Sequence, residues 1–318
     1  MSDNTPLILV NPPPLGTLDT PGLKKLEEAG YRLWRNETGV TLTSHELCKR
    51  LPEAVAVLGG LETYSDDIMA LSPNLKTIAR FGVGFDNVDL EAAKTRGIEV
   101  TISPGANTQS VSDVVMALMT SLACSILPNH AEVMAGGWKK TKFPGLYGST
   151  LGIIGFGRIG QAVAKRAEAF GMKILSYDPY NTNVPSATPI DQVIAQADVL
   201  TLHVPAVDKP ILDAAAIATI KRGAIVINAA RGGLLDETAL AEALHDGRLG
   251  GAGLDVFAEE PLGDSPLRSA PNVILTPHIA GVSASATAIM ADMCAVSLLA
   301  CLSGNEVPQE RLIVPRPT

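Results

Sequence analysis

Short runs of apolar residues alternate along this chain with longer segments in which apolar positions recur every three or four residues. The short runs have the length and the Val, Ile and Leu content of buried parallel strands, and the longer segments have the period of amphipathic helices. In the first third of the chain the predicted strands are 7–10, 31–34, 54–58, 75–80 and 98–102, and the predicted helices are 22–29, 44–51, 65–71 and 89–96. Alternating strands and helices predict an α/β fold, with a parallel sheet that carries helices on both faces.

The same alternation resumes after a different stretch in the middle of the chain. A long apolar helix is predicted over 108–127, and a connecting or partner-contacting loop, rich in Gly, Pro and aromatic residues, over 136–149. The further predicted strands are 151–154, 173–177, 199–204, 224–229, 251–256 and 272–276, and the further helices are 161–170, 236–245 and 286–302. Because the last helix follows the final strand, it must pack on another part of the chain. We therefore expect two domains, one formed by 1–103 plus 287–318 and a central one formed by 104–286.

A glycine motif of the form G-x-G-x-x-G joins the strand at 151–154 to the helix that follows it. The motif consists of Gly155, Phe156, Gly157, Arg158, Ile159 and Gly160. In dinucleotide-binding domains the three glycines permit a tight turn, close approach of a pyrophosphate and close helix–strand packing, and the helix N-terminus attracts the phosphates. Taken alone, a glycine-rich turn is more often only a turn.

A carboxylate in the right place strengthens this interpretation. Asp178 ends the next predicted strand, 18 residues past Gly160. There it can accept hydrogen bonds from both hydroxyls of an adenosine ribose and repel a 2′-phosphate. An Asp in an Asp-Pro turn is otherwise an ordinary solvated residue. Together the two features predict a dinucleotide site that prefers NAD to NADP.

Composition and charge narrow the classes of protein further. With 318 residues, of which 46% are hydrophobic and 18% charged, the chain is long enough for two α/β domains with buried sheets. A net charge of −8 without a basic stripe argues against nucleic acid as a partner. No apolar run approaches the roughly 20 residues of a membrane span, and the first residues do not resemble a secretory signal. The four cysteines lack metal-ligand spacing, so we expect a cytoplasmic protein with reduced cysteines and no metal.

Reactive side chains follow several of the predicted strands, and ligands of open α/β sheets bind beyond the carboxyl ends of strands. Arg231 offers a planar fork of donors that suits the carboxylate of an α-keto acid. His278 can give or take one proton per turnover near neutral pH, and Glu260 would favour its imidazolium form and fix the ring's orientation. Backbone N–H groups at Val83 and Gly84, from the other domain, could bind the substrate carboxylate. We expect these groups to meet in one cleft that binds and polarises a carbonyl compound.

Each of these residues also has an ordinary structural interpretation. A lone Arg at a strand end is usually part of a surface ion pair, and a Glu-Glu-Pro segment is usually a solvated turn. His278 alone would be a structural histidine about as often as a catalyst. His203 is interpreted as a structural loop residue near the cofactor. The functional interpretation therefore depends on Arg231, Glu260 and His278 occurring together behind a glycine motif.

The segments around these residues resemble the D-isomer-specific 2-hydroxyacid dehydrogenases. The resemblance rests on residues 228–233 (NAARGG), 254–261 (LDVFAEEP) and 277–281 (PHIAG), and on 82–89 (GVGFDNVD), which looks like that family's substrate-side loop. It extends over nearly the whole chain, with four motifs in the family's order and spacing.

The resemblance implies a Rossmann dinucleotide-binding domain inserted in a flavodoxin-like, parallel-sheet substrate domain, with NAD as cofactor and a homodimer built on the central domain. It implies that Arg231 anchors the substrate, that His278 is the acid/base and that Glu260 is its partner. The positions that match the family's cofactor contacts are Gly155, Phe156, Gly157, Arg158, Ile159, Gly160, Asp178, Pro205, Ala229, Ala230, Asp255 and Gly281. The implied reaction is the interconversion of a small D-2-hydroxy acid and its 2-keto acid by hydride transfer.

Other members of this fold are alternatives. Relatives that act on 3-phosphoglycerate tend to carry a basic residue and Ser or Thr in the loop after the third strand, whereas residues 58–62 (LGGLE) offer a phosphate no cation. Formate dehydrogenases carry Gln where Glu260 stands, and phosphite dehydrogenases carry a Lys near Val83. NADH-sensing corepressors of this fold carry a Trp after the PH motif and long tails, whereas residues 281–283 (GVS) follow the motif here and the tails are short. The identity of the 2-hydroxy acid does not follow from the sequence.

Overall fold

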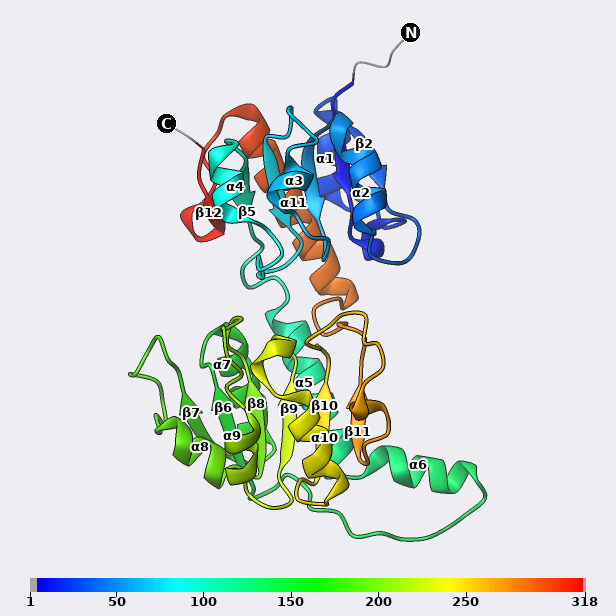
Figure 1. Ribbon diagram of the computed structural model, residues 1–318, viewed down its shortest axis with the longest axis vertical. Coiled ribbons are helices and arrows are strands. Elements are labelled where there is room, and N and C mark those ends of the chain that lie inside the picture. Colours follow the sequence, from blue (N-terminus) through cyan, green and yellow to red (C-terminus); the bar gives the residue numbers. More distant parts are fainter. Residues whose placement is uncertain (1–4, 317–318) are drawn as a thin grey trace. The chain divides into compact units, whose positions relative to one another are not determined.

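The computed structural model describes residues 5–316, which fold into two compact units (Figure 1). Unit 1 takes its residues from Met1–Asn107 and Gly281–Thr318, and unit 2 is Thr108–Ala280. The expected domain limits were 103/104 and 286/287; the contacts place the division at 107/108 and 280/281, next to the starts of two long helices. Each unit is a sheet covered by helices, which confirms the predicted fold class.

The sheet of unit 1 has six strands in the order β12-β5-β4-β3-β1-β2. Their bounds are Leu7–Val10 (β1), Arg32–Arg35 (β2), Ala54–Gly59 (β3), Thr77–Arg80 (β4), Glu99–Thr101 (β5) and Leu312–Val314 (β12). Five strands are parallel, and β12 pairs antiparallel with β5. The strand β12 was not predicted from the sequence, because only three apolar residues stand between prolines there.

Helices cover both faces of this sheet because successive strand residues point to opposite sides. Leu7 and Leu9 pack in one core with α2 (Ser44–Arg50), α3 (Asp66–Met69) and α4 (Leu90–Thr95). Ile8 and Val10 pack in the other core with α1 (Pro21–Glu28) and α11 (Ala284–Ser303). Asp292 of α11 accepts a 2.6 Å hydrogen bond from the N–H of Gly22, which joins the helix from the end of the chain to the helix from its start.

The last helix, α11, is more apolar than the composition suggested. Among the described residues it is the one unbroken helix whose length and mean hydropathy of 1.8 would permit a membrane span, so the expectation that no apolar run approaches that length is wrong. The bent pair α5–α6 passes the same test only if it is counted as one span. Half of the α11 window is buried within the protein, where the helix contacts α1, β3 and β4. The central helix of a water-soluble domain meets the same criteria of length and hydropathy.

The sheet of unit 2 is fully parallel, in the order β11-β10-β9-β8-β6-β7. Its strands are Thr150–Ile154 (β6), Lys173–Tyr177 (β7), Val199–Leu202 (β8), Ile225–Asn228 (β9), Gly251–Leu254 (β10) and Val273–Leu275 (β11). Its helices are α5 (Thr108–Ala123) and α7 (Arg158–Ala169) on one core, and α8 (Ile190–Gln196), α9 (Ala214–Thr219) and α10 (Glu237–His245) on the other. The chain leaves β6 toward β7 and then returns to β8 on the other side of β6. The loop after β6 therefore lies at the switch point where ligands of such sheets bind.

One predicted helix is wrong in its extent. The sequence suggested a single helix over 108–127 and a loop from Pro128, but α5 ends at Ala123 and a second helix, α6 (Ile126–Met134), follows at 62° to it. The break lies at Ser125, whose φ of 51° is left-handed and cannot continue a helix. Pro128 is accommodated in the first turn of α6, where its missing N–H has no helical partner to lose. Figure 1 shows α6 and the loop after it extending away from the sheet of unit 2.

Candidate active site

The three glycines of the motif after β6 meet different surroundings. Gly155 has a left-handed φ of 97°, and a Cβ there would lie 2.5 Å from the backbone carbonyl of His203. A Cβ on Gly160 would overlap the carbonyl oxygen of Gly155, so this glycine permits close packing of α7 on β6. A Cβ on Gly157 would meet only open space. Of the three, Gly157 is therefore the one whose missing side chain leaves room for a ligand.

The first turn of α7 supplies hydrogen-bond donors at the same place. Gly157 is its N-cap residue, and within the described residues no side chain caps this end. The first helical hydrogen bond is donated by Gln161 to Gly157, so the N–H groups of residues 158–160 have no helical acceptor. Uncapped amides and the positive end of the helix dipole form a site for a phosphate anion.

Asp178 organises the loop that was expected to bind the ribose. Its Oδ2 accepts a hydrogen bond of 2.7 Å from the N–H of Phe156, inside the glycine motif. Its Oδ1 accepts from the N–H groups of Tyr180 and Asn181, at 2.8 and 3.0 Å. A carboxylate has about four acceptor positions, so three bonds leave room for a ribose hydroxyl. The ribose contact of Asp178 stays a prediction, and its hold on the glycine loop is a second role that spacing alone did not show.

Arg231, Glu260 and His278 follow the carboxyl ends of β9, β10 and β11, three neighbouring strands of unit 2. His278 Nδ1 lies 2.7 Å from Glu260 Oε2, and Glu260 Oε1 accepts from the N–H of Phe257 at 3.1 Å. Burial raises the pKa of the Glu260 carboxyl, but the hydrogen bond and charge of His278, the Phe257 N–H and the charge of Arg231 outweigh it, so the pKa is lowered. The structure thus joins Glu260 and His278 directly and brings Arg231 within their electrostatic reach.

Buried backbone contacts hold the segment of Arg231 against the segment that leads to Glu260. A Cβ on Gly232 would overlap the backbone of Phe257 and Ala258, so only glycine permits this approach. On the other side, Asn228 donates to the carbonyl of Arg231 at 2.7 Å and accepts from the N–H of Ala230 at 3.1 Å. Asn228 was not singled out from the sequence, although a buried Asn at the end of a strand often fixes the turn that follows.

Asp255 holds the segment that carries His278. It is fully buried, and its carboxylate accepts hydrogen bonds from the hydroxyl of Thr276 and the N–H groups of Ile279 and Ala280, at 2.6, 2.9 and 2.8 Å. The donors of these bonds therefore flank His278, from two residues before it to two residues after it. The expected cofactor contact of Asp255 stays a prediction; the observed contacts make it a positioning residue for the histidine.

The other predicted contacts are distributed over both units. Pro205 is exposed after β8, Ala229 and Ala230 are half-buried after β9, and Gly281 is the first residue of unit 1 after the His278 segment. In unit 1, the turn at Gly82 leaves the N–H groups of Val83 and Gly84 without an acceptor among the described residues. This is the state that a carboxylate-binding pair of amides requires, and the substrate role of both residues stays a prediction.

His203 is a histidine of a different kind. Its Nε2 lies 3.0 Å from the hydroxyl of Thr201, and its Nδ1 is buried with no hydrogen-bond partner among the described residues. Burial lowers the pKa of His203 to about 4, so the ring is neutral at physiological pH. Its carbonyl abuts Gly155, which agrees with the interpretation of His203 as a structural residue beside the glycine motif.

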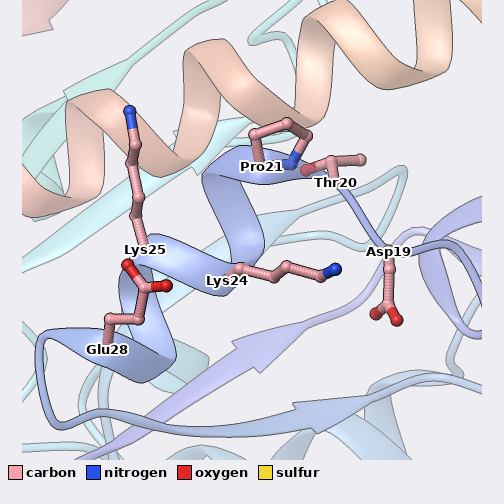
Figure 2. Close-up of a pocket in the computed structure, with 6 residues that line it drawn as sticks. All are labelled: Asp19, Thr20, Pro21, Lys24, Lys25 and Glu28. Carbon is pink, nitrogen blue, oxygen red and sulfur yellow. The ribbon is translucent and has the colours of Figure 1, made fainter.

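A surface depression in unit 1 is lined by none of these residues. It lies along α1 and is lined by Asp19, Thr20, Pro21, Lys24, Lys25 and Glu28 (Figure 2). Asp19 is paired with Arg35 at 2.8 Å, and Thr20 caps α1 by accepting from the N–H of Leu23. Its charges are of both signs. Among residues 5–316 no group of three His, Cys, Asp or Glu side chains could hold a metal ion; the absence of a metal stays a prediction.

The fold and these contacts define a class of protein: a parallel α/β domain that binds a dinucleotide at the switch point, with an Arg, a Glu and a His at neighbouring strand ends. The comparisons with known proteins agree. Residues 116–280 match the NAD-binding domain of the D-isomer specific 2-hydroxyacid dehydrogenases. The chain belongs to this family, and the match confirms both the recognised family and the predicted NAD-binding domain.

Curated and solved relatives extend the similarity beyond that domain. The D-3-phosphoglycerate dehydrogenase of Methanocaldococcus jannaschii is 40% identical over 96% of this chain and 61% of its own length. The hydroxypyruvate reductase of Thermotoga maritima is 41% identical over 82% of this chain and 90% of its own length. The crystal structure of the TT0316 protein from Thermus thermophilus has a TM-score of 0.88 and 38% identity, and the match covers 97% of this chain and 100% of that one. This chain spans only 52% to 61% of the length of the phosphoglycerate dehydrogenases it matches.

Proposed function

We propose that this chain is an NAD(H)-dependent oxidoreductase that interconverts a small D-2-hydroxy acid and its 2-keto acid. The observation that carries the proposal is the 2.7 Å contact between His278 and Glu260, beside Arg231, in a domain that matches an NAD-binding domain. A histidine paired with a carboxylate is suited to proton transfer, and an arginine beside it is suited to a carboxylate substrate.

Each side chain has one task in this reaction. The guanidinium of Arg231 anchors the substrate carboxylate, together with the N–H groups of Val83 and Gly84. Because His278 Nδ1 is bonded to Glu260, Nε2 is the nitrogen that exchanges a proton with the substrate oxygen. For reduction, the imidazolium gives its proton to the carbonyl oxygen, and the Glu260 carboxylate stabilises that imidazolium before transfer.

The residues at the glycine motif fit the dinucleotide that this chemistry requires. Gly157 leaves open space, residues 158–160 offer uncapped N–H groups, and the Asp178 carboxylate keeps one acceptor position for a ribose hydroxyl. We propose that Pro205, Ala229, Ala230, Asp255 and Gly281 complete the cofactor contacts. The bound nicotinamide supplies or accepts the hydride; the protein positions it and handles the proton.

A second candidate function is D-3-phosphoglycerate dehydrogenase, which is favoured by the 40% identity to enzymes of that name. The loop after β3 weighs against it, because residues 58–62 contain a glutamate and no cation. Relative turnover of phosphorylated and unphosphorylated substrates distinguishes the two functions.

The proposal includes a homodimer built on unit 2. Large apolar side chains on α6 and the loop after it are exposed; they are Ile126, Leu127, Val133, Met134, Trp138, Phe143 and Tyr147. Trp138 is 81% exposed and Tyr147 is 91% exposed, which is costly in water unless a partner covers them. A second copy of the chain is the partner that the family resemblance implies. A cytoplasmic location, with no nucleic-acid or membrane partner, completes the proposal.

A spectrophotometric screen tests the proposed function. The oxidation of NADH and NADPH is followed at pH 7 with glyoxylate, hydroxypyruvate, 3-phosphohydroxypyruvate, pyruvate and longer 2-oxo acids. We expect turnover of at least one unphosphorylated 2-oxo acid with NADH. A chain that binds NADH but reduces none of these acids would contradict the enzyme proposal.

A further inference from the structure

Buried polar side chains gather in unit 1 where β1, β3 and β4 end. Asn11 and Tyr64 are fully buried, and Glu62 and Arg80 are only 3% and 4% exposed. Asn11 Nδ2 donates to the Tyr64 hydroxyl at 2.9 Å, and that hydroxyl lies 3.4 Å from Glu62 Oε2. Burying two charged groups costs several kcal/mol of desolvation each, which apolar residues would not incur. The two buried charged side chains are therefore expected to serve the segments to which they are hydrogen-bonded.

Arg80 joins the last residue of β3 to the loop that follows β4. Its Nη1 donates to the carbonyl of Gly59 and its Nε donates to the carbonyl of Gly84, both at 3.1 Å. The planar guanidinium can reach both carbonyls at once, whereas a lysine ammonium is a single point donor on a flexible stem. The side chain of Arg80 therefore ties the end of β3 to the Gly82 turn, whose N–H groups at Val83 and Gly84 have no acceptor among the described residues.

Glu62 fixes the loop after β3 from its other side. Its Oε2 accepts from the N–H of Gly60 at 2.9 Å, and the side chain of Asn87 donates to the carbonyls of Gly60 and Glu62. Backbone bonds between Tyr64 and residues 87 and 89 join the same two segments. Burial raises the pKa of the Glu62 carboxyl, and the charge of Arg80 opposes that rise, so the two side chains form one network.

We propose that Arg80 and Glu62 are positioning residues that hold the loops after β3 and β4 as one rigid support for the substrate-binding N–H groups of Val83 and Gly84. This inference rests on the proposed function, because it assigns those amides to the substrate carboxylate. Neither side chain touches the substrate. Replacing either side chain should lower the affinity for the substrate but not the affinity for the dinucleotide. The predicted dinucleotide contacts lie in unit 2, except for Gly281.

The test compares Arg80→Lys and Glu62→Gln with a matched control, Glu99→Gln. Glu99 is a buried carboxylate of the same sheet, 6% exposed, and it is paired with Arg316 at β5, away from the two loops. For the best 2-oxo acid of the screen we expect KM to rise about tenfold in Arg80→Lys and about threefold in Glu62→Gln, with kcat changed less than about threefold, as for the loss of uniform binding. The Kd for NADH should stay within about twofold of wild type in every variant.

Amide hydrogen exchange supplies a readout that does not depend on turnover. In Arg80→Lys the hydrogen-bonded amides that join the two segments, those of Phe81 and Tyr64, should exchange faster than in wild type, and in Glu99→Gln they should not. Glu62→Gln keeps the shape of the side chain and serves as the test if Arg80→Lys does not fold.

Two outcomes would overturn the inference. One is a KM within about twofold of wild type in both loop variants; the other is an equal rise of KM in Glu99→Gln, which would show general destabilisation. A wild-type protein that reduces no 2-oxo acid would reject the proposed function, and this inference with it.

Discussion

His278 has a backbone conformation that few residues with a side chain adopt. Its φ is 53°, and its N–H is donated to the carbonyls of Asp255 and Thr276 at 2.9 and 3.0 Å. A left-handed residue of this kind costs about 1–3 kcal/mol and persists only where its surroundings determine it. Here the buried carboxylate of Asp255 imposes this backbone conformation, because it accepts hydrogen bonds from the N–H groups of Ile279 and Ala280, directly after the histidine. The same contacts hold the imidazole beside Glu260.

Replacing His278 by Gln should separate proton transfer from cofactor binding. We expect His278→Gln to lower kcat for 2-oxo acid reduction by about a thousandfold, since the amide can neither give nor take the proton. NADH affinity, measured by protein fluorescence, should change less than about twofold. His245→Gln is the matched control, because His245 is exposed at the end of α10 and should leave both quantities unchanged. A large loss of NADH affinity in His278→Gln would instead assign the histidine to the cofactor.

At the scale of helices and strands, the sequence predicted an element's limits best where a strong local signal, such as a helix cap, marks them. The helices α4 and α10 lie where 89–96 and 236–245 were predicted, because an Asp N-cap (Asp89, Asp236) and a left-handed Gly (Gly97, Gly247) act locally. The break at Ser125 and the strand β12 were missed, because tertiary packing and a partner strand decide them. The hydrogen bonds of Asp178, Asp255 and Asn228 were missed for the same reason. A sequence shows that a carboxylate ends a strand but not which amides it meets.

The separate roles of Gly157 and Gly160 in the glycine motif can be tested by replacing each with alanine. Gly157→Ala adds a methyl group in open space, so the free energy of unfolding should change by less than about 0.5 kcal/mol. The same methyl would stand where the pyrophosphate is expected, and NADH should bind at least about tenfold more weakly. Gly160→Ala places its methyl on the Gly155 carbonyl and should destabilise the fold by about 1–3 kcal/mol. Chemical denaturation and NADH titration of both variants check this; equal effects on stability would contradict the assignment of separate roles.

At the scale of the whole molecule, His203 makes stability depend on pH. Its folded pKa of about 4 lies below the value of 6.5 for an unperturbed histidine, so the unfolded chain binds a proton first as the pH falls. The stabilising contribution is complete above pH 6.5 and is lost progressively toward pH 4, and over that range it amounts to about 3 kcal/mol. We expect His203→Asn to flatten the pH dependence of the free energy of unfolding in this window. His45→Asn, at an exposed position on α2, should leave the slope as in wild type; a flattened slope there too would contradict the assignment.

The exposed apolar surface of α6 and its loop predicts the state of association. These side chains make few contacts within their own unit; α6 has no buried residue, although it is a helix of mixed apolar and polar character. A monomer would leave them in water, whereas a second copy can cover them by self-complementary packing. We expect sedimentation equilibrium to give twice the chain mass of 33.2 kDa for wild type. The double variant Met134→Glu with Trp138→Glu should sediment as a monomer, because charges would then be buried in the interface.

Tyr180→Glu is the control for this experiment. Tyr180 is 77% exposed, follows β7 and lies outside the surface of α6 and its loop, so the variant should remain a dimer. NADH titration of the monomeric variant shows whether unit 2 keeps its fold, since the glycine motif is not altered. A double variant that binds NADH and still sediments at twice the chain mass would place the interface elsewhere. A wild-type monomer would refute the dimer itself while leaving the proton chemistry of His278 and Glu260 intact, because both residues belong to one chain.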